Sequence, residues 1–205
     1  MPFGPNPVSI SDQEFDRLYP EEIQTLSHMH WSSIAAIKTA IDLFSATLNP
    51  DAKILDVGSG VGKFCIYGSL ISPFNFVGVE KRKKLVDISI EVAAKTKNNR
   101  VSFLCDDAVN LDWNSFDGIY MYNPFYEHKL PFHMGLHIDN EINYSEEKYS
   151  FYITKIHKKL SLLKPDTNIV VFNGYGGRFP KGYTEIFYKK INGGKMSLWR
   201  ASREA

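Results

Sequence analysis

Apolar residues at helical spacing mark four segments of the chain. The first has one apolar helical face, made of Ile34, Ile37, Ile41 and Phe44. We expect Ser32 or Ser33 to cap this helix and residues 49–51 to end it. Further helices are predicted at 64–71, at 81–97 and around 153–163. In the helix at 81–97, the residues expected to face inward are Leu85, Ile88, Ile90 and Val92.

Short apolar runs between these helices predict buried strands. They occupy residues 54–57, 76–79, 101–104, 118–122 and 169–172. Because strand and helix alternate, a right-handed parallel sheet is expected. Two further runs, 185–188 and 196–199, flank a turn at 192–194 and predict an antiparallel hairpin. The predicted fold class is therefore α/β: a doubly wound, mostly parallel seven-stranded sheet with a C-terminal antiparallel hairpin, in a three-layer sandwich.

Composition adds little to this picture. The 205 residues are 43% hydrophobic and 23% charged, as expected for one soluble globular domain. The formal net charge of +1 gives no support to a nucleic-acid partner, although it does not exclude one. Cys65 and Cys105 lie in apolar stretches, so we expect both in the core of a protein from a reducing compartment. Residues 1–12 do not resemble a signal peptide and no run is long enough to span a membrane, so the expected location is cytoplasmic.

The strongest local signal follows the first predicted strand, where residues 56–62 read Asp-Val-Gly-Ser-Gly-Val-Gly. Glycines allow a backbone to approach a ligand closely. In a doubly wound sheet, this turn lies at the edge where ligands bind. The pattern is one residue shorter than the dinucleotide fingerprint, and Lys63 is followed by Phe64, which excludes a Walker-type phosphate loop.

Polar side chains follow the ends of the next three strands. Glu80 closes the second strand, where a carboxylate can accept hydrogen bonds from ribose hydroxyls. Asp106 and Asp107 close the third, where a side chain can meet an adenine amino group, and Asn123 closes the fourth. One such residue alone is more often a cap or a turn residue. Their order at consecutive strand ends predicts a site for a nucleoside-type cofactor.

These residues resemble the class I S-adenosylmethionine-dependent methyltransferases over roughly residues 30–200. Segments 56–62, 79–80 and 105–108 are similar to the first three motifs of that family. The predicted C-terminal hairpin is similar to the last two strands of the family's sheet. The absence of a full helix between the fifth strand and the hairpin departs from the family pattern. The resemblance implies S-adenosylmethionine as cofactor, bound by Asp56, Gly58, Ser59, Gly60, Gly62, Glu80, Asp106, Asp107 and Asn123.

Within the family, segments 57–62 and 78–81 together resemble the seven-strand protein lysine methyltransferases. The sequence Asn123-Pro124-Phe125-Tyr126 resembles the N-P-P-[YF] motif of amide and amine N-methyltransferases, with Phe125 in place of the second proline. An Asn oxygen can accept a hydrogen bond from a substrate –NH2 and orient its lone pair, while an aromatic face stabilises the developing cation. Asn123 and Tyr126 are therefore the predicted catalytic residues. The alternative is a strand end followed by a turn.

Other polar residues nearby leave alternatives open. Glu127 and His128 could take a proton from a substrate amine, or they are surface loop residues, the interpretation we favour. His133 and His137 stand four apart, but the sequence around them does not favour a helix, so no metal is predicted. The basic run 81–84 is expected to be a solvated helix turn and not a nucleic-acid patch.

We predict an N-terminal segment, residues 1–30, that either folds across the cofactor as a lid or packs in the core, and a methyltransferase domain, residues 31–205. The predicted substrate is a nitrogen of a lysine-like protein side chain or of a small amine. A nucleic-acid N-methyltransferase of the adenine type and a non-catalytic Rossmann-like nucleotide-binding module are the alternatives. Residues 125–144 are expected to form a lid or binding loop. No membrane partner is predicted, and substrate identity and oligomeric state stay open.

Overall fold

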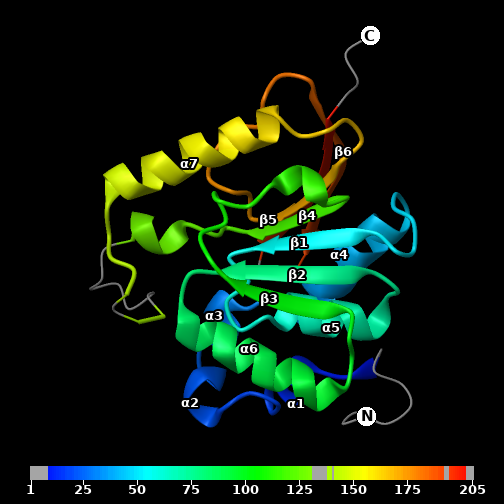
Figure 1. Ribbon diagram of the computed structural model, residues 1–205, viewed down its shortest axis with the longest axis vertical. Helices are drawn as coiled ribbons and strands as arrows, with labels where there is room; N and C mark the ends of the chain where they lie inside the picture. The colour runs from blue at the N-terminus through cyan, green and yellow to red at the C-terminus, as the bar shows by residue number, and fades with distance from the viewer. Residues whose placement is uncertain (1–8, 131–137, 140, 192–193, 202–205) are drawn as a thin grey trace.

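The computed structural model describes residues 9–130, 138–139, 141–191 and 194–201. Its centre is a seven-stranded sheet with the order β3-β2-β1-β4-β5-β7-β6 (Figure 1). The parallel strands are β1 (Lys53–Val57), β2 (Asn75–Glu80), β3 (Val101–Cys105), β4 (Gly118–Tyr122) and β5 (Asn168–Phe172). An antiparallel hairpin completes the sheet, formed by β6 (Tyr183–Ile191) and β7 (Gly194–Ala201). The predicted fold class is confirmed.

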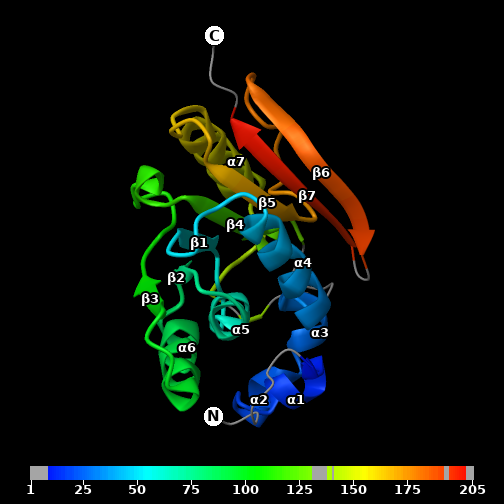
Figure 2. The same cartoon turned by 90° about the vertical axis from the view of Figure 1, so that its right-hand side faces the viewer.

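Helices cover both faces of the sheet. The N-terminal part forms α1 (Asp12–Asp16), α2 (Glu21–Gln24), α3 (Ser27–His30) and α4 (Ile34–Ser45). The remaining helices are α5 (Lys63–Ile71), α6 (Lys83–Thr96) and α7 (Glu146–Ser161), with the short 3-10 turns η2 (Trp113–Ser115) and η3 (Tyr126–Lys129) on either side of β4. Figure 2 shows α7 on one side of the sheet, opposite α4, α5 and α6. None of the helices in the described ranges is long and apolar enough to cross a membrane.

Side chains alternate between the two faces of the sheet along each strand, and this produces two separate hydrophobic cores. Side chains of neighbouring strand residues point to opposite faces of a sheet. Ile54 therefore packs with α4, α5 and α6, whereas Leu55 packs on the other face beneath α7. The same division separates Tyr120 from Ile119 in β4. This pattern explains the three layers and leaves the carboxyl ends of the parallel strands together at one edge.

The structure confirms one of the local predictions and contradicts another. Ser33 caps α4, because its hydroxyl accepts a hydrogen bond from the Ala36 N–H at 3.2 Å, and α4 ends at Ser45, before the predicted stop. The expectation that Ile90 faces inward is wrong. Ile90 is half exposed, because it lies two residues beyond Ile88 and therefore on nearly the opposite side of α6. Residues 192 and 193 of the predicted hairpin turn lie outside the described residues.

The two cysteines have different surroundings. Cys65 is fully buried in α5, as expected. The expectation of a buried Cys105 is wrong, since this residue is exposed at the end of β3, an edge strand with a neighbour on only one side. Neither cysteine is in a disulfide.

Candidate cofactor and methyl-transfer site

The carboxyl ends of β1, β2 and β4 open into a cavity of about 470 Å³, a size typical of small-molecule sites. With one exception, every residue predicted to bind the cofactor or to act in catalysis lines this cavity. These lining residues are Asp56, Gly58, Ser59, Gly60, Glu80, Asp106, Asp107, Asn123 and Tyr126. The exception is Gly62. A Cβ at this position would collide with the ring of Phe103, so the absence of a side chain allows the turn to pack against β3.

The glycine turn adopts a backbone that favours glycine. Gly58, Gly60 and Gly62 have φ values of 72°, 53° and 77°, in the left-handed region that other residues rarely enter. The N–H groups of Gly58 and Ser59 both donate to the carbonyl of Val79, at 3.0 Å each, which ties the turn to β2. A Cβ built on Gly60 would meet no atom within 4 Å. The turn therefore leaves open space for a ligand at its centre.

Glu80 is held in place at the end of β2 by two backbone groups. Its Oε2 accepts a hydrogen bond from the Gly60 N–H at 3.2 Å, and its Oε1 accepts one from the Arg82 N–H at 3.0 Å. The residue is only 8% exposed, although it lines the cavity. Because a carboxylate has about four acceptor positions, these bonds leave capacity for the two hydroxyls of a ribose.

Asp56 lies at the floor of the cavity and has no cationic partner among the described residues. Its Oδ2 accepts a hydrogen bond from the Cys65 thiol, with an Sγ–Oδ2 distance of 3.5 Å. Burial raises the pKa of Asp56 to about 7, and the nearby charge of Glu80 acts in the same direction. A positively charged ligand in the cavity would favour the ionised form of this carboxyl.

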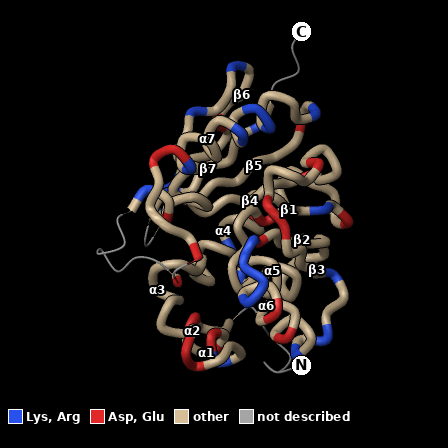
Figure 3. The backbone as a smooth tube through the Cα atoms, turned by 60° about the vertical axis from the view of Figure 1, so that its left-hand side comes forward, with Lys and Arg blue, Asp and Glu red and all other residues tan. Residues whose placement is uncertain are grey.

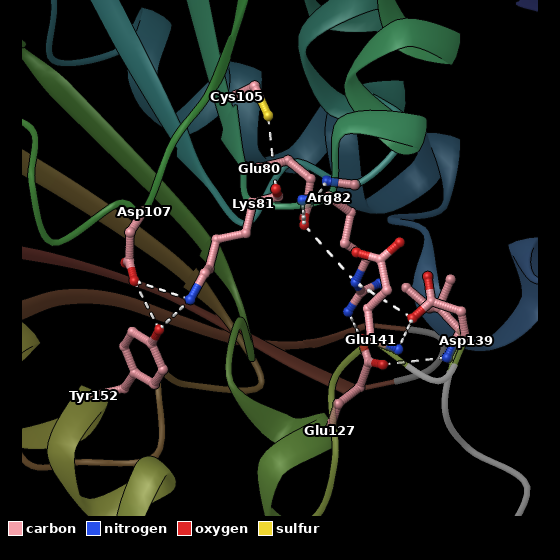
Figure 4. Close-up of polar contacts among 11 residues, drawn as sticks. Glu80, Lys81, Arg82, Cys105, Asp107, Glu127, Asp139, Glu141 and Tyr152 are labelled. Carbon is pink, nitrogen blue, oxygen red and sulfur yellow. Dashed lines mark hydrogen bonds and ion pairs between the residues drawn. The ribbon is translucent and has the colours of Figure 1, made fainter.

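The third strand end is tied to α7. Tyr152 donates a hydrogen bond from its hydroxyl to Oδ2 of Asp107 at 2.7 Å, and Lys81 donates from Nζ to the Tyr152 hydroxyl at 2.8 Å (Figure 4). The ring of Phe125 stacks on Tyr152 with a centroid distance of 4.7 Å. Asp106, by contrast, is exposed and accepts a hydrogen bond from Asn110 at 2.8 Å. Of the two predicted adenine-site acids, Asp107 is thus the more firmly positioned.

The predicted catalytic segment lies directly beside the glycine turn. A Cβ built on Gly58 would lie 3.2 Å from Cβ of Pro124. Asn123 has a φ of 43°, and its backbone bonds to Gly174 and Tyr126 hold this uncommon conformation. The Asn123 side chain forms no hydrogen bond with any described residue, and Tyr126 is 43% exposed. Asn123 and Tyr126 therefore line the cavity, and no described residue forms a hydrogen bond with the Asn123 side-chain amide.

The structure corrects two expectations about charged residues. Arg82 is not on a solvated helix turn: it is 3% exposed, lines the cavity and pairs through Nη2 with Oε1 of Glu127 at 2.5 Å. Figure 4 shows its guanidinium between Glu80 and the carboxylates of Glu127 and Asp139. Glu127 and His128 are not surface loop residues either, because both line the cavity and His128 is buried.

His128 has a defined hydrogen-bond partner. Its Nδ1 lies 3.0 Å from the carbonyl oxygen of Asn143, and a carbonyl can only accept, so Nδ1 carries the hydrogen. Burial lowers the pKa of His128 below its ordinary value. The neutral ring then keeps a lone pair on Nε2, and His128 lines the cavity. No pattern around His128 predicted this burial; only its position directly after the Asn123 motif pointed to the site.

The N-terminal segment contributes to both the core and the cavity. Tyr19 is buried, while Met29 and His30 line the cavity, as does Trp31 directly after the segment. Lys63, at the start of α5, is 3% exposed and pairs with two N-terminal carboxylates. Its Nζ lies 2.6 Å from Asp12 and 2.7 Å from Asp16. These pairs fasten the N-terminal helices to the end of the glycine turn.

Within the described ranges, no group of three or more His, Cys, Asp or Glu side chains could hold a metal ion. His133 and His137 lie outside the described residues.

Solved structures with the same fold include two in complex with S-adenosylmethionine or S-adenosyl-L-homocysteine. An RNA methyltransferase from Salinibacter ruber in complex with S-adenosyl-L-homocysteine is 18% identical, with a TM-score of 0.57 over 82% of this chain and 94% of that one. A mutant of MtNAS in complex with S-adenosylmethionine is 10% identical, with a TM-score of 0.60 over 94% and 72%. An rRNA methylase from Streptococcus thermophilus is 12% identical, with a TM-score of 0.55 over 82% and 97%. At these identities the likeness establishes the fold.

Together with the motifs, the fold defines the chain as a class I S-adenosylmethionine-dependent methyltransferase, an enzyme that uses S-adenosylmethionine as its cofactor. The alternative of a non-catalytic module is therefore not supported. More narrowly, the chain belongs to the family of protein-L-isoaspartate(D-aspartate) O-methyltransferases, whose model matches residues 9–121. That match ends within β4, before Asn123, and so does not include the predicted catalytic segment. No curated protein matches the sequence significantly.

Proposed function

We propose that this enzyme transfers the methyl group of S-adenosylmethionine to a nitrogen atom, on a lysine-like side chain, a small amine or another –NH2 group. The observation that carries this proposal is that Asn123 lines the cavity beside the glycine turn and that its side chain bonds to no described residue. An amide oxygen in that position can accept a hydrogen bond from an N–H group and orient the nitrogen lone pair.

The charges around the cavity support a nitrogen acceptor over a carboxylate. The Lys and Arg side chains that line it are Lys63, Lys81 and Arg82. All three already pair with carboxylates of the protein. An incoming carboxylate would find each of these cations already beside a carboxylate of the protein, whereas an amine would find several acceptor oxygens. This argument favours N-methylation over the carboxyl O-methylation after which the family is named.

The proposed reaction is a direct displacement in which position matters most. S-adenosylmethionine, when bound, supplies an electrophilic methyl group. Asn123 holds the acceptor N–H and fixes its direction, and the ring of Tyr126 lies where positive charge develops on the nitrogen. His128 has the neutral ring and the Nε2 lone pair needed to accept the proton that the nitrogen releases. Asp56, Gly58, Ser59, Gly60, Glu80, Asp106 and Asp107 hold the cofactor in this proposal.

The part of the chain before α4 belongs to the same proposal. Residues 9–30 would close one side of the cofactor cavity, and the methyltransferase domain would comprise residues 31–205. Two free thiols support a reducing compartment such as the cytoplasm.

Radiolabelled methyl transfer into cell lysate tests the acceptor atom. Protein, nucleic acid and small-molecule fractions would be counted before and after mild alkaline treatment, because methyl esters hydrolyse to methanol under conditions in which N-methyl groups persist. We expect base-stable label whose rate of incorporation falls strongly with Asn123→Ala. Label released as volatile methanol would instead assign carboxyl O-methylation and overturn the proposal. Binding of S-adenosylmethionine by both proteins, measured by calorimetry, is the control for folding.

A further inference from the structure

Charge is separated along the molecule, although the formal net charge is only +1. Residues 1–61 contain eight acidic and three basic side chains, whereas residues 146–200 contain eleven basic and four acidic ones. Figure 3 shows Asp and Glu gathered on α1 and α2 at one end, and Lys and Arg around α7 and β6 at the other. A nearly neutral total therefore hides a basic end that could attract a polyanion.

The β6–β7 hairpin carries part of this charge in an unfavourable arrangement. Lys190 lies directly opposite Lys195 in the register of the two strands, and both side chains are exposed. Like charges at directly opposed positions destabilise a sheet. No described acidic residue forms an ion pair with either lysine. Two residues before Lys190 on the same face, Tyr188 is 51% exposed and lies opposite Ser197. We call Tyr188, Lys190 and Lys195 the basic hairpin face.

This face begins beside the cofactor cavity. The N–H of Lys195 donates to Oδ1 of Asn173 at 3.0 Å, and the N–H of Asn173 donates to the carbonyl of Lys195 at 2.8 Å. Asn173 follows β5 and lines the cavity. A polymer bound along the basic hairpin face would therefore pass close to the cavity and to Asn123.

We propose that the basic hairpin face docks a single-stranded nucleic acid, with phosphates between Lys190 and Lys195 and a base on Tyr188. Phosphate groups would neutralise the opposed lysines, and an exposed aromatic ring beside them is the pattern of sequence-tolerant single-strand binding. An acidic peptide would use the lysines but would gain little from the ring. The proposal rests on the proposed nitrogen methylation and deepens it, because the acceptor is then the exocyclic amino group of a nucleobase.

Fluorescence anisotropy with a short, labelled, mixed-sequence single-stranded RNA tests the docking surface on the full chain. We expect affinity to fall with salt, and the slope of log affinity against log salt to drop by about 0.7 for each phosphate contact removed. Lys190→Glu should weaken binding several-fold. The same change places a carboxylate opposite Lys195 and should leave the melting temperature unchanged or raise it. Lost RNA affinity without lost stability is a result that a merely structural role cannot produce.

Two comparisons complete the test. Lys158→Glu makes the same charge change at an exposed position of α7 and should weaken binding much less. Tyr188→Ala should lower RNA affinity while leaving binding of a poly-glutamate peptide unchanged. No RNA binding at low salt, equal loss in Lys158→Glu, or poly-glutamate competing as well as RNA would each overturn the proposal. The RNA-binding measurements involve no methyl transfer. If they fail, the test of nitrogen methylation by alkaline treatment still stands. If the methyl label is instead released by base, the RNA-binding result still stands.

Discussion

Arg82 and Glu127 form an ion pair at the wall of the cavity, with side chains 4% and 15% exposed, although 45 residues separate them in sequence. Burial opposes the charge of Arg82, but Glu127 and Glu80 raise the pKa of its guanidinium above the ordinary value. Glu127 in turn accepts a hydrogen bond from the Ile138 N–H at 3.2 Å. Arg82 therefore connects Glu80, the carboxylate predicted to bind the ribose, with the segment that follows the predicted catalytic residues.

Arg82→Gln should destabilise the protein by about 3 kcal/mol, because it leaves the buried Glu80 and the partly buried Glu127 without their shared cation. Thermal melting measures the loss, and calorimetry should show weaker binding of S-adenosylmethionine. The double variant with Glu127→Gln should recover part of the stability, since it removes one of the unpaired charges. Lys83→Gln, one residue along and exposed, is the matched control. A loss as large in the control would show that Arg82 has no special role.

Glu80→Ala should weaken S-adenosylmethionine binding by roughly 1.5–3 kcal/mol, more than one neutral hydrogen bond, because a charged acceptor for ribose hydroxyls is removed. Isothermal calorimetry measures the affinity. Asp87→Ala removes an exposed carboxylate of the neighbouring helix and should leave affinity unchanged. Unchanged affinity in a folded Glu80→Ala protein would remove this residue from the cofactor site.

Gly58→Val and Gly78→Ala should fail in different ways. At Gly58 the backbone has a positive φ, and a side chain would press on Pro124, so the valine should abolish cofactor binding. At Gly78 a Cβ would lie 2.6 Å from the Phe103 ring inside the sheet, so alanine should lower the melting temperature first. Melting curves with and without S-adenosylmethionine separate the two effects. The prediction fails if Gly58→Val keeps its cofactor-induced rise in melting temperature.

The sequence predicted the fold, and it predicted which strand-end residues line the cavity, because those signals are local. The glycine turn and the strand-end acids Glu80 and Asp107 can each be recognised within a few residues of a predicted strand. The other contacts join distant positions, such as Lys81 with Tyr152, which are 71 residues apart. The basic run 81–84 led to the wrong expectation that Arg82 is solvated, because partners from another part of the chain bury it. Which charged residues become buried depends on tertiary packing that no periodicity encodes.

Asp56 should make stability depend on pH. Its pKa is raised from 3.8 to about 7 by burial, so the folded state holds this proton more tightly than the unfolded state. The contribution of Asp56 to the free energy of unfolding is then full below about pH 4 and is lost as pH rises through about 7. Asp56→Asn should therefore melt at a higher temperature than the wild type at about pH 8 without cofactor, with the difference shrinking on acidification. An advantage for the variant that grows at low pH would contradict this assignment.

Asn123→Ala should lower kcat on the true acceptor on the order of a hundredfold, because a misdirected nitrogen loses most of the benefit of orientation in a displacement. Affinity for S-adenosylmethionine should stay nearly constant, which is the pattern of an interaction made in the transition state. Tyr126→Phe should be milder than Tyr126→Ala, since the ring face and not the hydroxyl meets the developing charge. Steady-state kinetics together with cofactor calorimetry distinguish these outcomes. If Asn123→Ala keeps full turnover, the segment is only the turn that ends β4, and the acceptor need not be nitrogen.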